Sequence, residues 1–188
     1  MSYNTHIDLF KQSLVHIPNE DHLNDIIDLF ANNERVIFCT MGKSAYICHK
    51  IVHSARSFGL NWHYLDASHA FHGDAGLIKE NDLLVFVSKS GETKETVDVA
   101  KYFDGWEKIA MTSNKLSSLN KNCRHSLIVP ILNEGGPYNV APMISTTLYM
   151  LVLHGILKST IENKNISLEE LARNHPAGKI GDILKKDG

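Results

Sequence analysis

Apolar runs alternate with segments of mixed polarity along the whole chain. Five consecutive apolar residues at 83–87 and a similar run at 35–40 predict strands that are buried on both faces. Apolar spacing of three and four residues predicts helices between the strands. Further strands are predicted at 61–66, 106–112 and 126–131, and helices at 5–15, 21–31, 43–58, 92–102, 116–122, 140–157, 167–174 and in a tail that ends at 186.

Strands that alternate with helices at this spacing are typical of an open parallel sheet. We therefore predict an α/β fold: a doubly wound, five-stranded parallel sheet flanked by helices, in the three-layer arrangement of flavodoxin-like and Rossmann-like proteins. A chain of 188 residues, 43% of them hydrophobic, has room for one substantial core, so we expect a single domain over 1–188.

A serine-rich turn follows the predicted strand at 83–87. Its sequence is Ser88-Lys89-Ser90-Gly91-Glu92-Thr93, and a helix is predicted to start within it. Hydroxyl groups at Ser88, Ser90 and Thr93 would lie where free backbone N–H groups and the positive end of the helix dipole favour a phosphate. The alternative is an ordinary helix cap, in which Ser90 caps the helix through Thr93 and no ligand binds.

A second polar turn follows the predicted strand at 35–40. Here Gly42 lets the backbone approach a ligand, and Lys43 and Ser44 stand at the start of a helix. The turn is not a nucleotide-binding P-loop, because Ile37 occupies the position of that motif's first glycine. The carboxyl ends of parallel strands share one edge of a sheet, so the two turns together predict a site for a small phosphorylated molecule.

Charge and cysteine usage narrow the class of partner. The formal net charge of −2 gives no basis for binding nucleic acid or an anionic membrane surface. Residues 1–6 show no secretory signal pattern. Cys39, Cys48 and Cys123 lack the spacing of metal ligands. Together these observations favour a cytoplasmic protein whose thiols are reduced and mostly buried.

The segment 140–157 carries no charged residue and is long enough to suggest a membrane span. Pro142, Ser145 and His154, among other polar residues, make it too polar for a hydrocarbon environment. We therefore expect a core helix here and no membrane partner.

The two polar turns are part of a longer set of motifs. The set is Met41-Gly42-Lys43-Ser44, His72-Gly73-Asp74, Ser88-Lys89-Ser90-Gly91-Glu92-Thr93, Ala141-Pro142-Met143-Ile144-Ser145-Thr146-Thr147 and His175-Pro176-Ala177-Gly178. With these motifs the chain resembles the SIS (sugar isomerase) domain of the D-arabinose 5-phosphate isomerase family. Full-length members of that family usually carry a pair of cystathionine-β-synthase-type modules after the last motif. The sequence after that motif is too short to hold them, so we expect the stand-alone form here.

The resemblance implies an aldose-ketose isomerase that interconverts D-ribulose 5-phosphate and D-arabinose 5-phosphate through an enediol. The product would supply the eight-carbon acid sugar (Kdo) of lipopolysaccharide or capsules. Such chemistry needs a base, an acid, a charge that stabilises the oxyanion and a phosphate-binding site, but no cofactor.

Carried over to this sequence, the family's catalytic positions are Lys43, Glu95, Glu134 and His175. Lys43 would stabilise developing negative charge, and Glu134 and His175 are both left as candidates for the general base. The expected substrate-binding residues are Gly42, Ser44, His72, Ser88, Ser90 and Thr93.

Departures from the family pattern leave the exact sugar open. His69 stands where many members have glutamate, and Lys89 replaces the usual asparagine between the two serines. One alternative is therefore an SIS isomerase for another phosphosugar, such as a hexulose 6-phosphate or a seven-carbon phosphate. The other is a non-catalytic, phosphosugar-binding regulatory module.

Eleven histidines raise the question of a metal site. His49 and His53 are four residues apart on a predicted helix, and His69 and His72 follow, but no carboxylate or cysteine completes a set. We expect no functional metal and at most incidental zinc binding. The resemblance also implies a homotetramer with active sites between subunits, in which a neighbour supplies His175.

Overall fold

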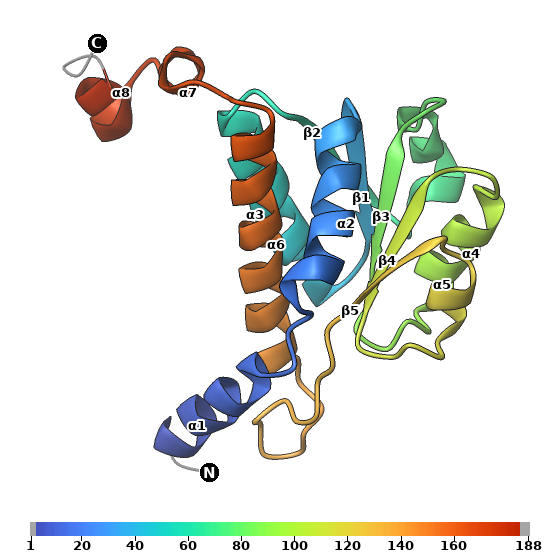
Figure 1. The fold of residues 1–188 in the computed structure, drawn as a ribbon. Coiled ribbons are helices and arrows are strands. Elements are labelled where there is room, and N and C mark those ends of the chain that lie inside the picture. The colour runs from blue at the N-terminus through green and yellow to red at the C-terminus, as the bar shows by residue number, and fades with distance from the viewer. Residues whose placement is uncertain (1–2, 185–188) are drawn as a thin grey trace.

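The computed structural model describes residues 3–184 and contains a five-stranded, fully parallel sheet (Figure 1). The strands are β1 (Arg35–Thr40), β2 (Asn61–Asp66), β3 (Leu83–Val87), β4 (Lys108–Thr112) and β5 (His125–Ile128). Their order is β2-β1-β3-β4-β5, and Val36 pairs with both Trp62 and Leu83. The predicted doubly wound α/β fold is confirmed, with its change of direction between β1 and β3.

Helices cover both faces of the sheet. In Figure 1, α2, α3 and α6 lie on one face, whereas α4 and α5 lie on the other. The helices are α1 (Tyr3–Leu14), α2 (Glu20–Asn32), α3 (Lys43–Ser57), α4 (Lys94–Tyr102), α5 (Ser118–Lys121), α6 (Ile144–Asn163), α7 (Leu168–Asn174) and α8 (Gly178–Leu184), with 3-10 turns η1 (Ala70–His72) and η2 (Asp74–Leu77). The last two residues of the predicted C-terminal helix, 185 and 186, lie outside the described residues.

Side chains of successive strand residues belong to two separate hydrophobic clusters, because they alternate between the two faces of the sheet. Phe38 and Val85 pack with α2, α3 and α6, whereas Phe86 packs with α4 and α5 on the opposite face. Phe30 of α2 contacts Phe38 and Trp62, with ring centroids 6.0 and 5.1 Å apart. Burial on both faces explains why these strands are almost continuously apolar.

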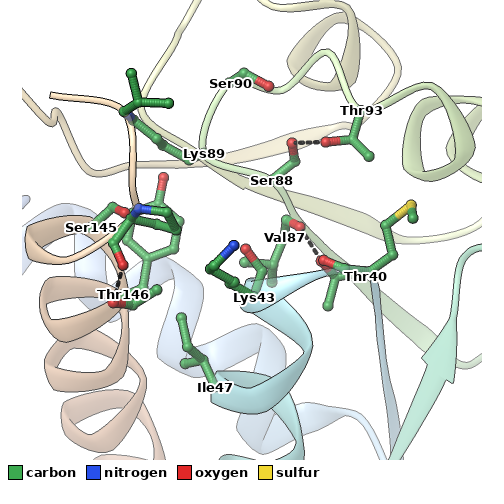
Figure 2. A pocket seen from close by; sticks show the side chains of 15 residues that line it. Thr40, Lys43, Ile47, Val87, Ser88, Lys89, Ser90, Thr93, Ser145 and Thr146 are labelled. Carbon is green, nitrogen blue, oxygen red and sulfur yellow. Dashed lines mark hydrogen bonds between the residues drawn. The ribbon is translucent and has the colours of Figure 1, made fainter. Parts of the chain in front are cut away.

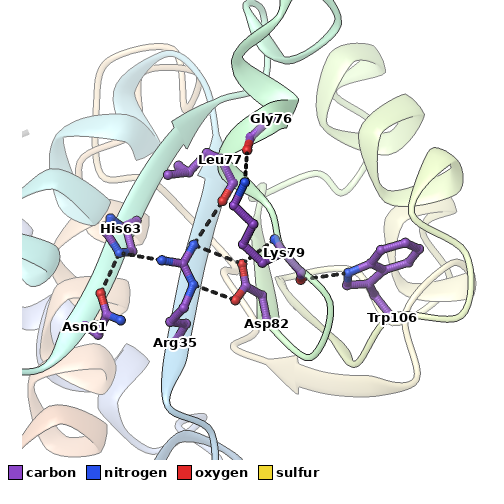
Figure 3. Close-up of polar contacts among 8 residues, drawn as sticks. All are labelled: Arg35, Asn61, His63, Gly76, Leu77, Lys79, Asp82 and Trp106. Atoms are coloured by element: carbon purple, nitrogen blue, oxygen red, sulfur yellow. Dashed lines mark hydrogen bonds and ion pairs between the residues drawn. The ribbon is translucent and has the colours of Figure 1, made fainter.

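A polar network closes the amino edge of the sheet (Figure 3). The Nε atom of Arg35 donates to Oδ1 of the buried Asp82 at 2.8 Å, and its guanidinium also donates to the carbonyl of Leu77 at 2.9 Å. Asp82 accepts the backbone N–H of Lys79, and the indole N–H of Trp106 donates to the Lys79 carbonyl. The network therefore fixes the loop before β3 against the start of β1.

Several predicted boundaries were wrong for local reasons. The helix predicted from 92 begins at Lys94, since Gly91 has φ of 67° and Thr93 is still extended. The helix predicted at 140–157 spans Ile144–Asn163 instead, and its start is later because Pro142 disfavours helical angles in the residue before it. The fifth strand was expected to reach 131 but ends at Ile128, close to Pro130, which has no N–H for a ladder.

Two further corrections concern the ends of short elements. The strand predicted at 106–112 begins at Lys108, after Gly105 with its φ of 86°, and the helix predicted at 116–122 spans Ser118–Lys121. In the second case Ser117 is the N-cap and accepts the N–H of Asn120, so the turn before it stays outside the helix.

Within residues 3–184, α6 alone has the length and hydropathy of a membrane-spanning helix. It contacts α1, α2 and α3, and half of its most apolar window is buried inside the protein. This packing is that of a core helix, as the sequence predicts.

We expect Leu84→Ala to destabilise the fold far more than Leu116→Ala, although the chemical change is the same. Leu84 is fully buried at the centre of the sheet, whereas Leu116 is 78% exposed. The first substitution should lower the free energy of unfolding by about 2–5 kcal/mol, and the second should change it by less than about 0.5 kcal/mol. Urea denaturation measures both, and equal losses would contradict this packing.

Candidate active site

A pocket of about 280 Å³ opens at the carboxyl edge of the sheet, between the ends of β1 and β3 and the start of α6 (Figure 2). Three helix starts contribute to its walls. Its lining consists of Thr40, Met41, Lys43, Ser44, Ile47, Val87, Ser88, Lys89, Ser90, Thr93, Val140, Pro142, Ser145, Thr146 and Tyr149.

The serine loop, residues 88–93, forms one wall. The hydroxyl of the buried Ser88 shares a hydrogen bond of 2.9 Å with the Thr93 hydroxyl and accepts the N–H of Gly91 at 3.1 Å. Ser90 accepts the N–H of Glu92 at 3.2 Å. These bonds hold the loop in one conformation with its hydroxyl groups beside the pocket.

The serine loop does not cap α4 in the ordinary way. The N-cap is Thr93, whose side chain makes no capping bond because its hydroxyl binds Ser88 instead. Among the described residues no hydrogen bond takes the backbone N–H of Ser90 or Thr93. The capping alternative through Ser90 is therefore wrong, and the start of α4 offers free N–H groups to an anion.

The start of α3 forms the facing wall. Lys43 and Ser44 both line the pocket, and Figure 2 shows the Lys43 side chain directed into it. Gly42 is the N-cap, with φ of 66°, a conformation that L side chains rarely adopt. It precedes the lining residues but does not itself line the pocket.

The start of α6 forms the third wall and is held by a buried carboxylate. Glu134 is fully buried, and its Oε2 accepts the N–H groups of Met143 at 2.9 Å and Ser145 at 3.0 Å. Lys89 of the serine loop forms an ion pair with Oε1, with 2.8 Å between the two atoms. Glu134 thus caps α6 from the loop that precedes this helix and connects it to the serine loop.

The environment of Glu134 keeps its side chain ionised. Burial by itself raises the pKa of Glu134, but the ion pair with Lys89 and the N–H groups of Ser145 and Met143 outweigh it and hold the pKa below the usual value. A general base works best when its pKa is near the working pH and its oxygen reaches the substrate proton. Glu134 does not line the pocket, so both criteria disfavour it as the base.

Two other predicted residues lie outside the pocket. Glu95 is exposed in the first turn of α4, two residues after Thr93, and does not line the cavity. His72 is exposed in η1, beyond the end of β2, and is likewise absent from the lining. Within a single chain, neither residue therefore lines the pocket together with Lys43.

His175 lies at the end of α3 that is opposite the pocket. It ends α7, where its Nδ1 contacts the Leu171 carbonyl at 2.9 Å, and the neighbouring Asn174 donates to the Ser57 carbonyl at the end of α3. Lys43 begins that same 15-residue helix, so α3 separates the two sites by about 22 Å. His175 cannot reach the pocket of its own copy.

Several lining residues were missing from the sequence prediction. Ser145, Thr146 and Pro142 belong to a motif that the sequence displays, but Val140 and Tyr149 carry no local signal. Burial raises the pKa of Tyr149, so its phenol stays neutral at the pocket wall. Within residues 3–184 no three metal-ligating side chains gather, at His49 and His53 or elsewhere.

A model of the SIS domain matches residues 29–158. The chain belongs to the SIS domain family. All residues that line the pocket fall inside the matched range, whereas His175 falls outside it.

Relatives of this SIS protein include the arabinose 5-phosphate isomerase KpsF of Escherichia coli O6:H1. It is 35% identical over 162 residues, which cover 85% of this chain and 50% of that protein. The chain thus spans about half the length of this curated relative.

Solved structures share the fold. A Bacteroides fragilis protein described as a putative phosphosugar isomerase involved in capsule formation is 26% identical, with a TM-score of 0.84 over 90% of this chain and 93% of that one. An Escherichia coli CFT073 protein in complex with arabinose 5-phosphate is 24% identical, with a TM-score of 0.84 over 92% and 95% of the two chains.

We expect Glu134→Gln to destabilise the protein in a pH-dependent way, with Glu95→Gln as its matched control. The folded pKa of Glu134 is lowered, so its contribution is fully present above the unfolded value of about 4.3 and is lost as the pH falls through the folded pKa. At pH 7 the loss in unfolding free energy should be on the order of 2 kcal/mol.

Urea denaturation of the three proteins between pH 7 and the acid limit of folding measures this effect. The difference between wild type and Glu134→Gln should shrink at low pH, and exposed Glu95 should show no such difference. A difference that stays constant down to the acid limit would contradict the ionised, buried state.

Proposed function

We propose that this SIS protein is a phosphosugar aldose-ketose isomerase that interconverts D-ribulose 5-phosphate and D-arabinose 5-phosphate. The observation that carries the proposal is the pocket itself, where the free N–H groups of the serine loop face Lys43 across a small cavity. The name of the Escherichia coli relative supports this choice of sugar. We further propose that the product serves synthesis of the eight-carbon acid sugar of lipopolysaccharide or capsules.

The phosphate would bind at the serine loop. The N–H groups of Ser90 and Thr93 and the first turn of α4 offer donors and a positive dipole to a dianion. Ser88 and Thr93 bond to each other and so keep this surface rigid. Binding at this remote group positions the reacting end of the sugar.

The isomerisation then moves one proton between adjacent carbons. In the aldose-to-ketose direction a base takes the proton from C2, the C1 carbonyl becomes an enediol hydroxyl, and a proton returns to C1 as the carbonyl forms at C2. Lys43, which lines the pocket, would stabilise the negative charge that develops on oxygen. We assign the base to His175, since Glu134 is buried, ionised and outside the pocket lining.

This assignment requires a second copy of the chain. His175 lies at the far end of α3 from Lys43, so it would enter the pocket of a neighbouring copy. The β5–α6 loop beside the pocket also exposes large apolar side chains, Leu132, Tyr138, Val140 and Met143. We propose a homotetramer whose active sites lie between subunits and in which Glu95 and His72 also approach a pocket.

A second candidate is isomerisation of a different phosphosugar by the same pocket. The specific observation in its favour is Lys89, a lining residue where the family usually has asparagine. A regulatory module that binds the phosphosugar without turnover would use the same serine loop but would not need His175.

The first test is proton exchange followed by NMR. Protein treated with EDTA is incubated with D-ribulose 5-phosphate in deuterated water, and we expect D-arabinose 5-phosphate with deuterium at C2. Lys43→Met should lower kcat by about a hundredfold or more, because removal of one stabilising donor typically costs that much. Binding without turnover would favour the regulatory module, and turnover of only another phosphosugar would favour the second candidate.

The second test mixes inactive subunits. Lys43→Met and His175→Ala should each be inactive, but unfolding and refolding them together should restore activity, since about a quarter of randomly assembled sites then carry neither substitution. Sedimentation establishes the assembly before and after mixing. Activity that stays at the level of the separate variants would contradict sites shared between copies.

A further inference from the structure

We propose that Lys89 is a further positioning residue of this pocket, which bridges the buried Glu134 to an oxygen of the sugar and not of the phosphate. The inference rests on the proposed function, since it concerns the same site. It adds to that function a residue that would determine which sugar end the pocket accepts.

The contacts of Lys89 leave donors for a ligand. Its ammonium has three N–H donors. It forms an ion pair with Oε1 of Glu134, with 2.8 Å between the two atoms. The side chain is 38% exposed and lines the pocket, while Glu134 is fully buried behind it. N–H donors of Lys89 are therefore available to a ligand in the cavity.

The direction of the side chain separates it from the phosphate site. In Figure 2 the Lys89 side chain runs away from Ser90 and Thr93 and toward the side of the pocket where Ser145 lies. Glu134 defines that position, because its other oxygen accepts the Ser145 N–H at 3.0 Å. A phosphate at the serine loop would therefore place the sugar, and not the phosphate, beside the Lys89 ammonium.

The charge balance supports the same division of roles. Glu134 neutralises Lys89, whereas in the described part of the chain no carboxylate lies within 4.0 Å of the Lys43 ammonium. Lys43 is thus the free cation of the pocket. Lys89, whose charge Glu134 balances, still has N–H groups that can donate to a hydroxyl or carbonyl oxygen.

Lys89 also governs the ionisation of Glu134. Its ion pair is the largest influence that lowers the pKa of Glu134 against the effect of burial. Without Lys89, burial would favour the protonated acid, which accepts fewer hydrogen bonds from the start of α6. The acid limit of folding should therefore move to higher pH in Lys89→Gln and return toward the wild-type position in Lys89→Arg.

The decisive experiment is calorimetric titration of the full chain with two probes, inorganic phosphate and D-arabinitol 5-phosphate, a reduced analogue that cannot isomerise. Lys89→Gln should weaken binding of the sugar analogue about tenfold, as expected for one charged hydrogen bond, and that of phosphate by less than about threefold. Lys89→Arg should retain most of the affinity. Ser88→Ala, the matched control, should weaken both probes alike.

Equal losses for both probes in Lys89→Gln would overturn the proposal in favour of a phosphate counter-charge. Unchanged affinity for both would overturn it in favour of a purely structural ion pair. A wild type that binds the analogue without isomerising ribulose 5-phosphate would refute only the proposed reaction. A wild type that does not bind the analogue would overturn the role of Lys89 itself.

Discussion

The carboxylate of Glu134 is the interaction on which the pocket depends. Its two oxygens serve different parts of the chain, since Oε2 caps the first turn of α6 and Oε1 pairs with Lys89. A 20-residue apolar helix that starts with uncapped, buried N–H groups would be costly, and a charge at its positive end removes that cost. The same carboxylate therefore stabilises the core helix and fixes one wall of the site relative to the other.

The two edges of the sheet are organised for opposite purposes. At the amino edge, Arg35 and Asp82 form hydrogen bonds with each other and with nearby backbone groups, so few of their polar atoms are free to bind a ligand. At the carboxyl edge, the starts of α3, α4 and α6 converge with their dipoles directed at one small cavity. This asymmetry arises because parallel strands with helical crossovers place the starts of their helices at the carboxyl edge, where the serine loop and Lys43 lie.

Sequence patterns predicted β1, β2 and β3 to the residue, because β1 and β3 are mainly apolar runs and β2 is marked by its aromatic residues and the preceding Gly59. They also predicted the serine loop and Lys43 as parts of one site, since local chemistry marks both. The pairing of Lys89 with Glu134 could not be predicted, because it joins segments that are far apart in the chain and depends on burial. Likewise, Val140 and Tyr149 reach the pocket through the position of α6, which no local motif encodes.

Burial of Glu134 bears on which residue can act as the general base. A carboxylate that is ionised, paired with a lysine and behind the pocket wall supports the architecture but is poorly suited to accept a proton in each turnover. If proton transfer falls instead to His175, then phosphate binding and proton transfer belong to different copies of the chain, because about 22 Å of α3 separates them within one copy. Binding would then need only the pocket of one subunit, whereas catalysis would need the contact between two, which makes assembly itself a condition for turnover.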